Sequence, residues 1–88
     1  STNSSGSGNT ALGVGALGGN STGANNTACG QGALSTNTIG SNNTAIGYQA
    51  NVSANNLTNA TAIGANAIVD ASNKVRIGDG AVTVIEGQ

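Results

Sequence analysis

The sequence predicts an all-β protein, a parallel β-solenoid built from coils of 17 residues. The first observation is a repeat: NTALG at 9–13 returns as NTACG at 26–30, NTAIG at 43–47 and ATAIG at 60–64. Successive glycines therefore stand 17 residues apart, which is typical of one supersecondary unit stacked on copies of itself. The second observation is that Gly, Asn, Thr and Ser dominate and no apolar stripe of helical period occurs, which disfavours helix throughout.

Each unit is expected to hold one main strand, near residues 9–14 in the first copy. Thr and an aliphatic residue alternate there with small residues, a period of two that places both on one face of the strand. A second short extended piece is expected near 16–18. The Asn-Asn and Gly positions between the strands indicate turns, because both residue types tolerate positive φ. Stacked coils then lie about 4.8 Å apart, with Asn ladders adding side-chain hydrogen bonds.

Two sets of columns are the candidate structural residues. The aliphatic column is predicted to be the core of the coil: Leu12, Cys29, Ile46, Ile63 and Ile77. The small residues are predicted to form a close-packing ladder at which neighbouring chains approach: Ala11, Ala28, Ala45, Ala62, Gly13, Gly30, Gly47, Gly64 and Gly78. Cys29 is interpreted as a small hydrophobe of the core, because the chain has no His to activate a thiol nucleophile.

The chain divides into an N-terminal partial coil (1–8), the repeats (9–69) and a charged transition or capping rung (70–88). All the charged residues lie in the last segment, and the glycine step from 64 to 78 is 14, three short of the others.

The last segment keeps a strand and the glycine in Lys74-Val75-Arg76-Ile77-Gly78. Arg76 replaces the alanine of the repeat, so the packing is expected to open there. Asp79-Gly80 indicates a turn into a final strand over 81–85.

Composition favours an oligomer and excludes several classes of function. The chain of 88 residues has one aromatic residue and one cysteine, too little to close a thick core or form an intrachain disulfide. With no His and three carboxylates, neither a metal nor another cofactor is expected, and no catalytic group is found. A net charge of −1 disfavours nucleic acid, and no apolar run approaches the roughly 20 residues of a membrane helix.

A flexible linker is the alternative that composition alone suggests. Aliphatic residues at a fixed register, and the absence of charge from residues 1–69, disfavour it.

The run T-A-[LI]-G, followed by a small residue and Ala, resembles the head repeats of trimeric autotransporter adhesins, whose hallmark is V-A-I-G. It stands here at 44–47 and 61–64, and as Val75-Arg76-Ile77-Gly78. The resemblance covers about residues 6–85. It implies a left-handed parallel β-roll, assembled as a homotrimer and displayed outside the cell for attachment.

Two stretches near the C-terminus, 72–78 and 82–88, are similar to the segment that precedes the intramolecular chaperone domain of phage tail fibres and related bacterial fibres. This second resemblance implies that the chain is the fibre portion beside that chaperone, and not the protease itself.

The expected function is therefore a structural or adhesive segment of an extracellular trimeric fibre, on a cell surface or a virion, that attaches to a glycan or another surface receptor. Tyr48 is the candidate surface contact, because its column (Val14, Gln31, Tyr48, Ala65) is not fixed by the repeat; an incidental surface tyrosine is the alternative.

Two other functions fit the sequence less well. Binding of ice or another crystalline surface would use the Thr ladder of the repeat, although that ladder shares its face with the aliphatic residues expected in the core. A depolymerising tailspike would need paired carboxylates, and residues 1–69 contain none, so no enzyme activity is expected.

Overall fold

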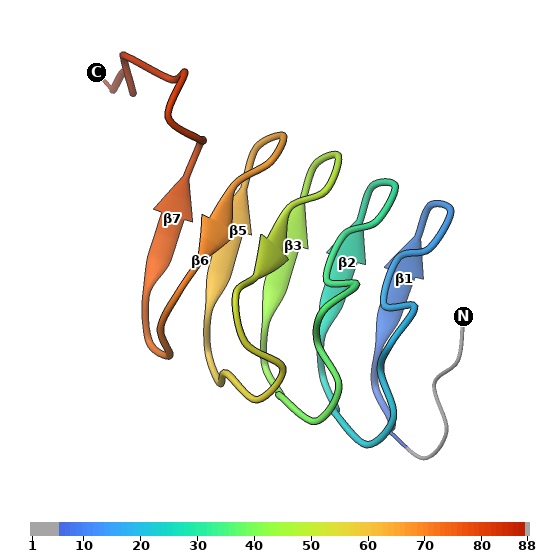
Figure 1. Ribbon diagram of the computed structural model, residues 1–88. Helices are drawn as coiled ribbons and strands as arrows, with labels where there is room; N and C mark the ends of the chain where they lie inside the picture. The colour runs from blue at the N-terminus through green and yellow to red at the C-terminus, as the bar shows by residue number, and fades with distance from the viewer. Residues whose placement is uncertain (1–5, 88) are drawn as a thin grey trace.

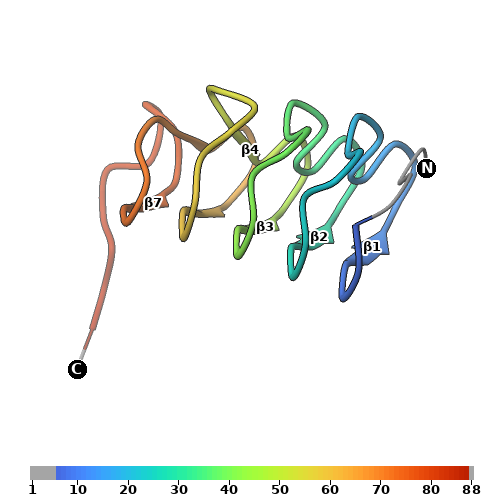
Figure 2. The ribbon, with the colours of Figure 1, turned by 90° about the horizontal axis from the view of Figure 1, so that it is seen from below.

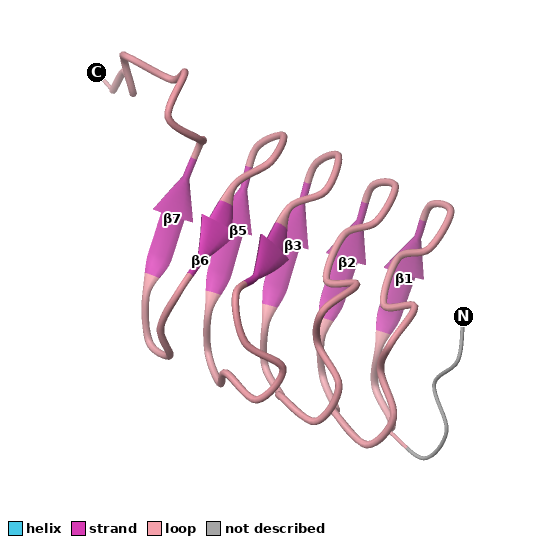
Figure 3. Ribbon diagram, in the orientation of Figure 1, coloured by secondary structure: helices cyan, strands magenta, loops and turns pink. Residues whose placement is uncertain are grey.

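The computed structural model of the chain describes residues 6–87. Within that range the protein is a parallel β-solenoid of about four turns without a helix, which confirms the predicted fold class (Figure 1, Figure 3). Residues 1–5 of the expected partial coil, and Gln88, lie outside the described residues.

One wall of the solenoid is a sheet of parallel strands, called the main sheet below. Its strands, in spatial order, are β1 (Thr10–Leu12), β2 (Thr27–Cys29), β3 (Thr44–Ile46), β5 (Thr61–Ile63) and β7 (Val75–Ile77). The opposite wall carries a smaller parallel pair, β4 (Asn51–Val52) and β6 (Ile68–Val69) (Figure 2). The principal extents are 40 × 25 × 22 Å. The coils stack in the direction that leads from β1 to β7 (Figure 1).

Strand pairing places like residues on like, as the repeat predicts. Thr10 pairs with Thr27, Thr27 with Thr44, and Thr44 with Thr61. The shorter last step keeps this register, since Thr61 pairs with Val75. The three missing residues therefore come out of a turn and not out of the ladder, because removing them from a strand would break its hydrogen bonds.

The prediction of a second extended piece near 16–18 is wrong for the first two coils. Leu17 and Leu34 both have φ of 55°, a left-handed conformation, and their side chains are 2% and 0% exposed. That conformation costs about 1–2 kcal/mol, whereas burying a leucine contributes about 1.5–3 kcal/mol. A paired strand forms on this wall only in later coils, where Val52 and Val69 are the buried residues.

The final strand expected over 81–85 is also wrong. After Gly78 the chain turns, with the Val82 amide donating to the Asp79 carbonyl at 3.3 Å, and then runs away from the stack without a strand partner (Figure 2). A strand needs a neighbouring strand edge to satisfy its backbone, and residues 82–87 pair with no strand among the described residues.

The core is made mostly of alanine. On the main sheet the residues that point inward are Ala28, Ala45 and Ala62, each 0% exposed. The opposite wall supplies the larger buried side chains: Leu17, Leu34, Val52 and Val69. The coil is thin, so only a small residue fits on one wall where a larger one enters from the other.

The prediction of an aliphatic core is therefore wrong. Leu12, Ile46, Ile63 and Ile77 are 67%, 44%, 38% and 45% exposed, and Cys29 is only half-buried. Side chains of a strand alternate between its two faces, so burial of the alanine column turns the aliphatic column outward.

Asparagine ladders with side-chain hydrogen bonds form, as expected, and Asn26 and Asn43 place them in the interior of the coil. The backbone amides of Asn26, Asn43 and Ala60 donate to the Oδ1 atoms of Asn9, Asn26 and Asn43 in the preceding coil, each at 2.9 Å. The Nδ2 atoms of Asn26 and Asn43 donate in turn to the carbonyls of Gly40 and Leu57 at 2.8 Å. Each buried amide thus joins two coils.

A second buried pair, Asn20 and Asn37, is linked to this ladder across Gly23 and Gly40. Asn37 Nδ2 donates to Asn20 Oδ1 at 2.9 Å, and Asn43 Nδ2 donates to Asn37 Oδ1 at 3.1 Å. A Cβ atom at Gly40 would collide with the Leu57 carbonyl and with both flanking asparagine amides. The two asparagines and the glycine of the pattern N-x-x-G-x-x-N therefore pack together as one unit.

Replacing Gly40 by Ala should therefore unfold the protein far more readily than the same change at Gly80, where an added Cβ meets nothing within 4 Å. We expect Gly40→Ala to lower the free energy of unfolding by on the order of 2–4 kcal/mol and Gly80→Ala by less than about 0.5 kcal/mol. Denaturant unfolding followed by circular dichroism measures both. Equal losses for the two variants would contradict the close packing at Gly40.

Candidate interaction surface

The outward face of the main sheet carries two parallel columns, which we call the outer stripe. It consists of the aliphatic column Leu12, Cys29, Ile46, Ile63 and Ile77 and the column Thr10, Thr27, Thr44, Thr61 and Val75. With one step of about 4.8 Å per coil, its five rungs span about 19 Å. The stripe runs in the stacking direction, from β1 to β7 (Figure 1).

The outer stripe is uncharged over its length and combines an aliphatic column with a column of threonines that ends in Val75. Its aliphatic side chains are between 38% and 67% exposed, apart from the half-buried Cys29. Thr10 and Thr27 are exposed, and Thr44 and Thr61 are half-buried. Single exposed aliphatics are common on protein surfaces, whereas a row of them is a candidate interaction surface.

The close-packing ladder serves contacts between successive coils of one chain. The alanines lie inside the coil, apart from the exposed Ala11 of the first rung. At Gly13 an added Cβ would lie 2.7 Å from the carbonyl carbon of Gly30, and at Gly47 it would lie 2.8 Å from that of Gly64. The expectation that neighbouring chains approach this face is therefore wrong, because the chain's own next coil occupies it.

Tyr48 lies on the turn after β3, beside the outer stripe, and its side chain is 51% exposed. The equivalent residues of the other coils, Val14, Gln31 and Ala65, are exposed as well. This turn edge can therefore change its side chains from coil to coil without disturbing the core.

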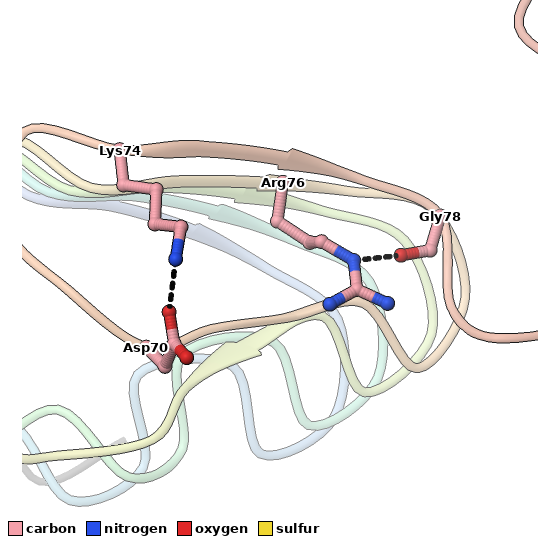
Figure 4. A network of polar contacts seen from close by, with 4 residues as sticks. All are labelled: Asp70, Lys74, Arg76 and Gly78. Atoms are coloured by element: carbon pink, nitrogen blue, oxygen red, sulfur yellow. Dashed lines mark hydrogen bonds and ion pairs between the residues drawn. The ribbon is translucent and has the colours of Figure 1, made fainter.

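The charged residues that carry contacts gather at the C-terminal end of the stack (Figure 4). Lys74 Nζ lies 2.8 Å from Asp70 Oδ1, and Arg76 Nε donates to the Gly78 carbonyl at 2.8 Å. The hydrogen bond from Lys74 and its positive charge lower the pKa of Asp70. Both members of the ion pair are exposed, so the pair is screened by water.

No concave site accompanies the outer stripe. The surface formed by residues 6–87 has no pocket, and no three His, Cys, Asp or Glu side chains gather there to hold a metal ion. The same residues include no helix of the length and apolarity needed to cross a membrane.

Comparison of the chain with protein-family models, with curated proteins and with solved structures finds no match.

Sequence reasoning missed the buried Asn20 and Asn37, although a signal for them exists. N-x-x-G-x-x-N occurs at 3–9, 20–26 and 37–43, and in the fourth unit all three positions change together, to Ala54, Leu57 and Ala60. A joint exchange of two amides and a glycine for apolar residues is what residues in mutual contact would show.

The face assignment predicts opposite results for two substitutions on neighbouring residues of β3. Ala45→Thr places a larger, polar side chain in the core and should cost about 3 kcal/mol of unfolding free energy. Ile46→Thr only extends the outward threonine column, so in the single chain, at a concentration too low for association, it should cost less than about 1 kcal/mol. Urea unfolding followed by circular dichroism measures both losses. A larger loss for Ile46→Thr than for Ala45→Thr would support the predicted aliphatic core instead.

Proposed function

We propose that this chain is a structural and adhesive segment of an extracellular trimeric fibre, in which three left-handed β-rolls lie side by side around a common axis. The observation that carries the proposal is the outer stripe, a straight row of exposed aliphatic side chains on a small, nearly uncharged solenoid. Three copies placed with their stripes toward one axis would cover this apolar surface.

The repeat makes such an interface grow with length. Burying a large aliphatic side chain contributes about 1.5–3 kcal/mol, and the stripe adds one aliphatic residue per coil. Because equivalent residues stand at equal heights, each rung of one chain meets the same rung of its neighbours. The trimer thus supplies the hydrophobic core that one thin coil lacks.

The resemblance to adhesin head repeats and to the segment before a fibre chaperone supports an extracellular place on a cell surface or a virion. Attachment would use the turn edge that carries Tyr48, which lies at the rim of the stripe and stays accessible in a trimer. An exposed aromatic ring suits stacking on a sugar of a surface glycan.

Charge placed on the outer stripe tests the trimer. Sedimentation should give the wild type a mass three times that of the chain, and Ile46→Lys with Ile63→Lys should give folded monomers, because two lysines per copy cannot be buried at the axis. Ile39→Lys is the matched control, since Ile39 is 54% exposed but lies outside the main sheet.

Cys29 offers an independent measurement in the same samples. As a member of the stripe it should react slowly with a thiol reagent in the wild type and rapidly in the double-lysine variant. A wild type that is a stable, folded monomer would rule out the trimer.

A second candidate function is binding of ice or another crystalline surface. The observation that favours it is the outward direction of the threonine column, which was expected to share its face with the core. On the main sheet the threonines repeat about every 4.8 Å along the stack, beside the aliphatic column about 7 Å away along each strand. This flat, uncharged array uses the face that the trimer would bury, so the two functions exclude each other.

Thermal hysteresis separates these functions. An ice binder should be a monomer whose hysteresis is abolished by Thr27→Lys with Thr44→Lys, because two bulky cations disrupt the flat array. Thr22→Lys with Thr58→Lys, at exposed positions outside the main sheet, should leave it unchanged. A trimer without hysteresis would remove this second candidate.

A further inference from the structure

The two inward-facing columns of the main sheet wall both end in a cation at the C-terminal end of the stack. One reads Asn9, Asn26, Asn43, Ala60 and then Lys74, and the other reads Ala11, Ala28, Ala45, Ala62 and then Arg76. In the coil before the last, Ala60 and Ala62 are 0% exposed. Lys74 and Arg76 therefore occupy core positions in the last coil of the described residues.

Both cations are held over the end of the last coil. Figure 4 shows their side chains reaching from the β7 side toward the wall that carries Asp70. Lys74 Nζ is paired with Asp70 Oδ1 at 2.8 Å, and Arg76 Nε is bonded to the Gly78 carbonyl at 2.8 Å. These contacts keep the charged groups above the alanine core and in water.

Val82 covers a third position on the same end. At Gly13, Gly30 and Gly47 an added Cβ would meet the backbone of the next coil. At Gly78, the last glycine of the column, it would meet the Val82 side chain, with Cγ2 at 2.6 Å. Val82, the last residue of the turn at 79–82, thus stands where the backbone of a further coil would lie.

Without such a cover, the ends of the solenoid would fit each other. In the described residues β1 and β7 are the two edge strands of a parallel sheet, and each coil pairs with the next in the same register. A second copy could then place its β1 on β7 as β2 lies on β1. Such a head-to-tail contact never closes, so it would continue into an open filament.

We propose that Lys74, Arg76 and Val82 close the C-terminal end against the β1 edge of a second copy of this chain. Among the described residues, Asp70 forms the one ion pair with these two cations. Stacking would trap both cations between alanine cores, and an uncompensated buried charge strongly opposes association. The inference concerns axial contacts, so it stands apart from the side-by-side trimer proposed above.

Restoring the repeat at these positions tests the proposal. The triple variant Lys74→Ala, Arg76→Ala, Val82→Gly should form elongated particles whose mass at least doubles and rises with concentration in sedimentation and electron microscopy. The wild type and Arg76→Lys, which keeps the charge, should hold a constant mass. Adding Ala11→Arg to the triple variant should return the constant mass, because it places a cation on the matching core position of β1.

The outcomes are separable from those of the fibre proposal. The mass of the wild type reports the lateral state, monomer or trimer, whereas the triple variant reports multiples of that mass. A folded triple variant with the mass of the wild type at every concentration overturns the inference, as does end-to-end association of the wild type. If the triple variant loses its strand signal in circular dichroism, the double variant Lys74→Ala, Arg76→Ala replaces it. Its mass in sedimentation should then rise with concentration, and a constant mass would overturn the inference.

Discussion

Hydrogen bonding from each coil to the next is the interaction on which the rest of this structure depends. The strands of the main sheet are only three residues long, and backbone hydrogen bonds between coils continue outside them, as from the Gly32 amide to the Val14 carbonyl at 2.9 Å. Asparagine side chains extend the ladder beyond the strands: Asn26 accepts from the amide of Asn43 and donates to the carbonyl of Gly40. Because each amide reaches the next coil at one height, the asparagines fix the register from Asn9 to Ala60. Backbone bonds such as that from the Thr61 amide to the Lys74 carbonyl, at 2.9 Å, carry it over the last step.

This use of the interior explains what is left for the surface. Asparagines, alanines and glycines fill the space between the walls, and the coil has no room for a column of isoleucine on the main sheet. The larger aliphatics of that sheet therefore point outward, although they are the most apolar part of the repeat. The outward face of the main sheet thus carries exposed aliphatic side chains, while the C-terminal end carries the charges of Lys74 and Arg76.

Much of the fold was predictable because it follows from spacing. The coil length, the parallel pairing of Thr10 with Thr27, and the shorter step to Val75 are all confirmed. The prediction of turns at the Asn-Asn positions holds as well. Asn25 and Asn42 have φ of 59° and 62°, a conformation that asparagine tolerates. The left-handed Leu17 was not predictable in this way, because its conformation is stabilised by burial and not by its own preference.

The sequence by itself determined the period, the register and the two faces of each strand, since identical residues at a constant spacing can pair in only one way. Only the tertiary structure decided which face lies inside. Alternation along a strand is symmetric between its faces, and Thr-Ala-Ile is compatible with either direction. The distance between the two walls breaks that symmetry: with Leu34 and Val52 entering from the opposite side, the main sheet wall accommodates alanine and turns isoleucine to the surface.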